Sequence, residues 1–106
     1  GTVTALHADA PDNLLAQAAG FKYVRLYDGA PDAPELHPVD PLRAGSANEF
    51  ARSSVRVEAP RDPSEPFARA SFAHVVIGPG DVLYIPRRRW HYVRSLTTSV
   101  SVNFWM

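Results

Sequence analysis

Two residues near the start of the chain have the types and spacing of metal ligands. His7 and Asp9 are separated by one residue, and residues 2–8 (TVTALHA) are compact and β-branched, which predicts a strand. Side chains two positions apart on a strand point to the same face, so an imidazole and a carboxylate would converge on one point. Alone this pattern is a weak signal, because it also fits the end of a surface strand.

A third candidate ligand, His91, lies near the other end of the chain. It follows a Gly-Pro-Gly-Asp turn at residues 78–81, a predicted strand at 82–85 and the segment 86–90 (PRRRW). A barrel could bring this strand beside the first one. Two imidazoles and one carboxylate would then form a face that leaves half of an octahedral iron(II) open for oxygen chemistry. The absence of cysteine excludes thiolate sites and disulfides and agrees with such a ligand set.

Lys22 is a second residue that could take part in chemistry. It starts the alternating segment 22–27 (KYVRLY), where it shares an inward face with Val24 and Leu26. An inward lysine requires a partner for its charge, and an acidic cosubstrate would supply one. A lysine at a strand end with its ammonium group in water fits the spacing equally well.

Polar residues on the predicted strands are further candidates for a binding pocket. Asn103 alternates with Ser101 and Trp105, which would place all three side chains inward. Regular alternation places Thr4 opposite to the predicted metal ligands, so a role there requires a twist or a bulge. Asn13 lies beside the first strand. Hydrogen-bonded polar groups of a β-core are the structural alternative for these residues.

The remaining pattern predicts short strands separated by turns. Residues 14–19 suit either a helix or a strand, and their separation from segment 22–27 by Gly20 and Phe21 predicts a β-hairpin. Residues 28–48 are rich in Pro, Asp, Ala and Gly, as in a long surface excursion. Trp90 and Phe104 are expected in the core. Further strands are expected at residues 54–58, 74–77, 82–85, 90–96 and 99–105, which together favour a β-sandwich or barrel.

Length and composition indicate one globular domain. The 106 residues suit a single unit, and 45% hydrophobic with 21% charged residues is an ordinary globular balance. Eleven basic and eleven acidic residues cancel, so no strong field favours nucleic acid or an acidic membrane surface. No apolar run has membrane-spanning length, and a cytoplasmic location is expected. Because the chain starts at Gly1 within a predicted strand, we expect that an N-terminal portion is missing.

The two candidate segments resemble the metal-binding stretches of JmjC (Jumonji C) domains. Residues 1–27 are similar to the first stretch, and residues 80–96 with 99–105 are similar to the second. The similarity is greatest to the cupin-like hydroxylase branch, of the factor-inhibiting-HIF and jumonji domain-containing protein 5 type. Residues 53–60 are similar more loosely. Two departures are Arg87-Arg88, where the family has a small pair, and Ala5, where it has proline.

The resemblance implies a fold and a set of site residues. It implies an all-β double-stranded β-helix, a cupin-like jelly roll with a long Pro-rich insertion. Residues 1–106 would form its catalytic core without the N-terminal elements of the family. It implies iron ligation by His7, Asp9 and His91, and pairing of Lys22 with the distal carboxylate of 2-oxoglutarate. Other cosubstrate-pocket positions matched by the resemblance are Thr4, Asn13, Asn103 and Trp105.

The resemblance also implies a reaction that uses Fe(II), 2-oxoglutarate and O2. In the family, decarboxylation of 2-oxoglutarate to succinate is coupled to hydroxylation of a C–H bond, here expected on a protein or peptide substrate. Three alternatives stay open: a demethylase, an oxygenase of tRNA or a small molecule, and a module that binds a metal or small acid without catalysis. A membrane or nucleic-acid partner is not expected, whereas an exposed strand edge leaves a homodimer open. The basic run 87–89 fits a solvated turn or a substrate-facing patch.

Overall fold

The computed structural model describes residues 3–28, 50–52, 57–58 and 70–106. This part of the chain consists of strands, turns and loops, without a helix. The predicted surface excursion and most of the strand expected at residues 54–58 lie outside the described residues. The strands are β1 (Val3–Asp9), β2 (Asn13–Ala19), β3 (Lys22–Tyr27), β4 (Phe50–Arg52), β5 (Phe72–Ile77), β6 (Val82–Ile85), β7 (His91–Ser95) and β8 (Val100–Trp105).

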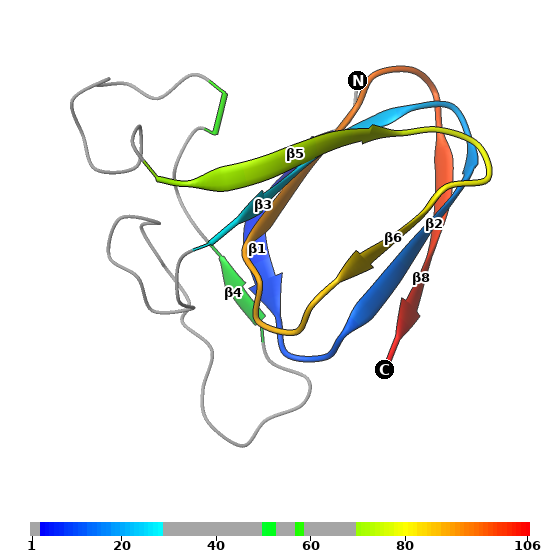
Figure 1. Cartoon of the computed structure of the whole chain (residues 1–106). Coiled ribbons are helices and arrows are strands. Elements are labelled where there is room, and N and C mark those ends of the chain that lie inside the picture. The colour runs from blue at the N-terminus through cyan, green and yellow to red at the C-terminus, as the bar shows by residue number, and fades with distance from the viewer. Residues whose placement is uncertain (1–2, 29–49, 53–56, 59–69) are drawn as a thin grey trace.

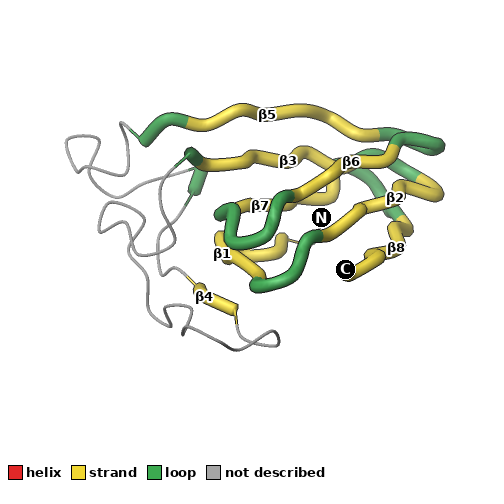
Figure 2. The backbone as a smooth tube through the Cα atoms, turned by 60° about the horizontal axis from the view of Figure 1, so that its bottom comes forward, coloured by secondary structure: helices red, strands yellow, loops and turns green. Residues whose placement is uncertain are grey.

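The strands form two antiparallel sheets that face each other. The larger sheet has the order β4-β1-β7-β3-β5, and the smaller sheet has the order β6-β2-β8. Figure 1 shows the two sheets on either side of a common interior, and Figure 2 shows β1, β7, β3 and β5 stacked beside β6, β2 and β8. This arrangement is the all-β jelly roll that the sequence predicts. No helix in the described ranges has the length and apolar character of a membrane span.

The predicted hairpin around Gly20 is wrong, because β2 and β3 belong to different sheets. β2 pairs with β6 and β8, whereas β3 pairs with β5 and β7. The connection crosses between the sheets, so the two strands face each other across the interior. Gly20 has φ +70°, and a Cβ there would lie 2.1 Å from the carbonyl oxygen of Thr98. The short connection therefore reflects close packing against the 97–99 loop and not a hairpin turn.

Apolar residues pack in two layers, one on each face of the larger sheet. The interior between the sheets contains Leu15, Val24, Ile77 and Ile85. The opposite face of the larger sheet contains a second buried cluster of Leu6, Ala8, Tyr27, Val57, Trp90 and Tyr92. Trp90 is fully buried there, as predicted. Both faces of β1, β3 and β7 are therefore covered, which holds these three strands firmly in place.

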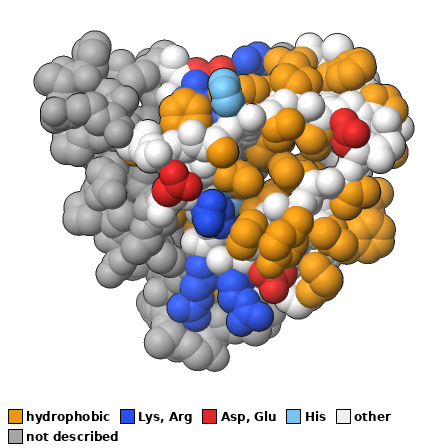
Figure 3. Space-filling view, viewed as in Figure 1, with side chains coloured by type: hydrophobic (Ala, Val, Ile, Leu, Met, Phe, Trp, Pro, Cys, Tyr) orange, Lys and Arg blue, Asp and Glu red, His pale blue; other side chains and the backbone are white. Residues whose placement is uncertain are grey.

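The outer face of the smaller sheet is apolar and exposed. Leu14 pairs with Tyr84 on one side and Phe104 on the other, and Ala16 pairs with Val82 and Val102 in the same way. Figure 3 shows hydrophobic side chains gathered over this side of the molecule, where β2, β6 and β8 lie. Phe104, expected in the core, is 54% exposed on this face. The alternation predicted along β8 is confirmed, because Asn103 and Trp105 point inward. The prediction that Phe104 lies in the core is wrong, because the same alternation turns it outward.

Candidate metal centre and adjoining cavity

The pairing of β1 with β7 brings the three candidate ligands together. His7 stands directly opposite His91 in the register, and Asp9 ends β1 two residues later on the same face. The Oδ2 atom of Asp9 lies 3.4 Å from Nε2 of His7 and 3.6 Å from Nε2 of His91. One possible ligand atom from each residue lies within 4.8 Å of the other two. Residues 84 positions apart in the chain therefore meet at one point, as the spacing and barrel argument requires.

Hydrogen bonding fixes the orientation of His91. Its Nδ1 atom donates to the carbonyl oxygen of Arg89 at 2.9 Å, which leaves the Nε2 lone pair directed toward Asp9 and His7. Burial, followed by the proximity of His7, lowers the pKa of His91 to about 4. The ring is therefore neutral near physiological pH, which is the form that binds metals. A carbonyl acceptor behind the ring is a common way of orienting metal-bound histidines.

The carboxylate of Asp9 has an oxygen atom near His7 and His91 that is available to bind a cation. Its Oδ2 atom is buried and accepts no hydrogen bond of good geometry. Burial by itself raises the pKa of Asp9, but the approach of His7 and then His91 outweighs it, so the pKa lies below the usual value. A bound cation at this place would compensate the buried carboxylate oxygen between the two imidazoles. The donor set of two nitrogens and one oxygen fits a divalent metal such as iron(II).

A bulge in β1 determines where Thr4 points. Thr4 pairs with Val93 and His7 pairs with His91, so three steps along β1 match two steps along β7. The extra residue shifts the alternation by one position, and Thr4 lines the same cavity as His7. Strict alternation would have placed Thr4 on the opposite face. The bulge supplies the irregularity that a role for Thr4 requires.

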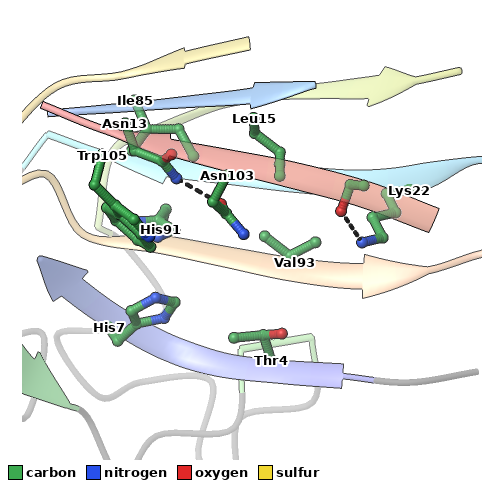
Figure 4. Close-up of a pocket in the computed structure, with 11 residues that line it drawn as sticks. Thr4, His7, Asn13, Leu15, Lys22, Ile85, His91, Val93, Asn103 and Trp105 are labelled. Atoms are coloured by element: carbon green, nitrogen blue, oxygen red, sulfur yellow. Dashed lines mark hydrogen bonds between the residues drawn. The ribbon is translucent and has the colours of Figure 1, made fainter. Parts of the chain in front are cut away.

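A cavity of about 140 Å³ lies between the two sheets, and two of the three candidate ligands, His7 and His91, line it. Figure 4 shows His7 and His91 at one end of this space and Lys22 at the other. All five residues predicted for the cosubstrate pocket line it. The full lining comprises Thr4, His7, Asn13, Leu15, Lys22, Ile85, His91, Val93, Ser101, Asn103 and Trp105.

Polar groups in the cavity form two hydrogen-bonded pairs. The ammonium group of Lys22 donates to the hydroxyl of Ser101 at 2.5 Å, and Nδ2 of Asn13 donates to Oδ1 of Asn103 at 2.8 Å. Asn13 is 2% exposed, and its Oδ1 atom has no hydrogen-bond partner. The side-chain nitrogen of Asn103 is turned toward the cavity (Figure 4). The cavity thus presents a cation and amide groups to a ligand.

Lys22 lies on the inward side of β3, as alternation with Val24 predicts. Within the described part of the chain, no carboxylate forms an ion pair with it, and its ammonium group donates to the hydroxyl of Ser101. The partnership with Ser101 was not predicted. Its signal was present in the sequence, because Ser101 shares a face with Asn103 and Trp105. An anion that enters this end of the cavity would meet a positive group held in position by β8.

Comparison with known proteins places the chain in a protein family. The profile of the family described as cupin-like domain matches residues 1–106. The chain belongs to this family, in the JmjC class of oxygenase-related domains. It is 46% identical over 106 residues to Lysine-specific demethylase 8 of Danio rerio, which covers 99% of this chain and 25% of that protein.

Two further relatives show similar coverage. Lysine-specific demethylase JMJ30 of Arabidopsis thaliana is 40% identical over 108 residues, with 99% of this chain and 23% of that protein covered. Jumonji C domain-containing protein 5 of Drosophila melanogaster is 38% identical over 108 residues, with 99% and 25% covered. The chain spans about a quarter of the length of the curated relatives that it matches. JmjC family members use Fe(II) and 2-oxoglutarate.

Proposed function

We propose that this chain forms the core of an Fe(II)- and 2-oxoglutarate-dependent oxygenase that hydroxylates a C–H bond of a protein side chain. The observation that carries this proposal is the relation between the two ends of the cavity. The imidazoles of His7 and His91 line one end, with the carboxylate of Asp9 close to both, and the ammonium group of Lys22 lies at the other end. 2-Oxoglutarate has a chelating keto acid at one end and a carboxylate at the other, which matches this polarity.

In this proposal His7, Asp9 and His91 would hold the Fe(II) ion through two imidazole nitrogens and one carboxylate oxygen. When bound, Fe(II) with 2-oxoglutarate and O2 supplies the oxidation, in which the cosubstrate becomes succinate and CO2 while a C–H bond is hydroxylated. The carbonyl of Arg89 keeps the Nε2 atom of His91 directed at the metal position. Asp9 contributes a negative charge that offsets part of the charge of the metal.

The proposed cosubstrate contacts follow from the lining of the cavity. Lys22 neutralises the distal carboxylate, in a partly buried setting where a charge pair is stronger than in water. Hydroxyl and amide groups that could bond to the cosubstrate line the cavity, from Thr4, Asn13 and Asn103. The ring of Trp105 covers one side of the space near His91 (Figure 4) and limits the entry of water.

The proposed reaction is the hydroxylation of a polypeptide side chain. Two of the relatives cited above carry the name lysine-specific demethylase. Demethylation is a second candidate, favoured by those names. It begins with the same hydroxylation, because a hydroxylated N-methyl carbon leaves as formaldehyde. The two candidates therefore share the metal centre and cosubstrate contacts and differ in the carbon that is presented.

The experiment that tests the proposal has two stages. Fe(II) and 2-oxoglutarate are added without oxygen, and the weak visible charge-transfer band of the chelate is followed; air is then admitted and succinate is measured. The proposal predicts both the band and succinate formation. A band without succinate would identify a binding module without catalysis, and the lack of a band would refute the metal and cosubstrate site. Formaldehyde release from methylated peptides separates demethylation from stable hydroxylation.

A further inference from the structure

A carboxylate outside the proposed ligand set joins the turn that follows Asp9 to the turn that precedes His91. Asp12 lies between β1 and β2, three residues after Asp9. Its Oδ1 atom accepts a hydrogen bond from the backbone N–H of Arg87 at 2.7 Å and another from the hydroxyl of Tyr84 at 3.0 Å. Its Oδ2 atom lies 3.6 Å from the Arg87 guanidinium group. Asp12 is therefore bonded to the end of β6 and to the turn that leads to His91.

That turn is attached to the metal centre at two more points. The backbone N–H of Arg88 donates to the carbonyl oxygen of Asp9 at 2.7 Å, and the carbonyl of Arg89 accepts from His91. Consecutive N–H groups of Arg87 and Arg88 thus both bond to the segment that contains Asp9 and Asp12. The turn is thus bonded both to the backbone of Asp9 and to the ring of His91.

The backbone of the turn is strained at its centre. Arg88 has φ +61°, a left-handed backbone conformation that residues other than glycine seldom adopt. Such a conformation persists only where surrounding contacts hold it in place. Its neighbours are fixed at both sides, because Arg87 is bonded to Asp12 and Arg89 lies 3.7 Å from a carboxylate oxygen of Asp28. These contacts support a solvated, paired turn over a free basic patch for Arg87 and Arg89.

We propose that Asp12 is a positioning residue for the metal centre. Its carboxylate fastens the 86–90 turn and thereby sets the place of His91 relative to the two ligands on β1. The inference rests on the proposed metal site and adds a residue that does not contact the metal. Residues that orient ligands from behind typically change metal affinity by about 10- to 100-fold when they are removed.

A purely structural role for Asp12 makes a different prediction, and Asp81 provides the matched control. Asp81 is also a turn carboxylate, since its Oδ2 atom accepts the backbone N–H of Gly78 at 2.8 Å. It lies at the opposite end of β6, before Val82, and does not line the cavity. Loss of either carboxylate removes a turn hydrogen bond. Asp12 holds the turn that leads to the candidate ligand His91, whereas Asp81 holds the turn at the other end of β6.

The test measures the affinity of the whole chain for Mn(II), the d–d spectrum of bound Co(II), and the thermal midpoint without metal. Asp12→Ala is expected to weaken Mn(II) binding by about tenfold or more and to alter the Co(II) spectrum. Asp81→Ala is expected to lower the thermal midpoint while leaving affinity and spectrum at parent values. Arg87→Ala keeps the backbone N–H and is expected to remain within a few-fold of the parent.

Asp12→Asn provides the answer if Asp12→Ala does not fold. It keeps the shape of the side chain and one acceptor oxygen, but its bonds are no longer charge-assisted, so a loss of about threefold in affinity is expected. Parent-like Mn(II) affinity in the folded Asp12 variants, or an equal loss in Asp81→Ala, would overturn the inference. Failure of the parent chain itself to bind Mn(II) or Co(II) would instead reject the proposed metal site.

Discussion

The ammonium group of Lys22 donates a hydrogen bond of 2.5 Å to the hydroxyl of Ser101 across the interior between the two sheets. The lysine comes from β3 of the larger sheet, and the serine comes from β8 of the smaller sheet. This contact holds a cation at the end of the cavity that lies away from His7 and His91 (Figure 4). In the proposed function, this ammonium group receives the distal carboxylate of 2-oxoglutarate.

Lys22→Ala is expected to weaken 2-oxoglutarate binding strongly. Loss of a charge-assisted hydrogen bond of about 2 kcal/mol corresponds to about a 30-fold higher Kd. Titration of the charge-transfer band of the Fe(II) complex under anaerobic conditions measures this constant. Mn(II) affinity in the absence of 2-oxoglutarate should stay at the parent value, because Lys22 is not one of the proposed ligands. Equal 2-oxoglutarate affinity in parent and variant would remove Lys22 from the cosubstrate site.

Ser101→Ala separates the charge of Lys22 from its placement. The variant keeps the ammonium group but removes the partner that orients it, so a smaller loss of about fivefold is expected, the equivalent of one neutral hydrogen bond. A loss as large as that of Lys22→Ala would mean that Ser101 itself makes the main contact with the cosubstrate.

His91→Ala is expected to abolish both succinate formation and thermal stabilisation by metal. A metal that binds only the native state at 100 times its Kd adds about 2.7 kcal/mol, which raises the thermal midpoint of a domain of this size by about 10 °C. The variant lacks one of three ligands and should show almost no such shift with Mn(II). Its cavity at a buried position also lowers stability without metal, so the comparison is between shifts and not between midpoints.

His74→Ala is the control for His91→Ala. His74 lies on β5, is exposed and bonds to the hydroxyl of Tyr23 through its Nδ1 atom. It is not among the residues that line the cavity. Its removal should preserve the metal-induced shift and succinate formation. If His91→Ala retained normal succinate production, the assignment of His91 as a ligand would be refuted.

The all-β class and the inward face of several strands could be predicted from local patterns, whereas the jelly roll and the set of candidate ligands came from the resemblance. Alternation along β8 placed Asn103 and Trp105 inward, and both line the cavity. The alternation of Lys22 with Val24 was equally informative, because Lys22 lines the cavity and Val24 is buried between the two sheets. The spacing of His7 and Asp9 on β1 was a weak signal alone and became informative only with a third candidate ligand, His91, on a strand that could lie beside β1.

Features that depend on pairing between distant strands could not be predicted. The bulge that turns Thr4 into the cavity is defined by the mismatch between β1 and β7, and the residues of β1 give no sign of it. The predicted hairpin at Gly20 was wrong for the same reason. The sequence of a short connection does not show whether it joins two strands of one sheet or strands of two sheets. The contacts of Asp12 could not be predicted either, because its partners, Tyr84 and Arg87, lie more than 70 positions away.

Thr4→Val tests the consequence of the bulge. The substitution keeps the shape of the side chain and removes its hydroxyl, so the free energy of unfolding should change by no more than about 0.5 kcal/mol. Loss of one hydrogen bond of about 1 kcal/mol should raise the Kd of 2-oxoglutarate about fivefold. Chemical denaturation and the anaerobic titration measure the two quantities. An unchanged Kd would show that the hydroxyl faces the cavity without contacting the cosubstrate.

The carboxylate of Glu58 predicts a pH dependence of stability that is independent of the metal centre. Its Oε2 atom accepts bonds of 2.6 Å from Nε of Arg94 and from the hydroxyl of Tyr92, and its Oε1 atom accepts from Nη2 of Arg94 at 3.1 Å. The Arg94 guanidinium group, only partly opposed by burial, holds the pKa of Glu58 below its ordinary value of 4.5. These bonds tie residues 57–58 to the outer face of β7.

Because the folded-state pKa of Glu58 is lowered, the unfolded chain binds more protons as the pH falls below 4.5. The stabilisation from Glu58 is therefore complete above the unfolded-state pKa and is lost as the pH falls through the folded-state pKa. Glu58→Gln should be less stable than the parent at neutral pH, and the difference should shrink steadily in acid. Urea denaturation of both proteins over this pH range measures it, with Tyr92→Phe as a variant that keeps the Arg94 pair and should retain most of the pH dependence. A difference between Glu58→Gln and the parent that stayed constant with pH would contradict an ionised Glu58–Arg94 pair and would leave only a neutral contact at this position.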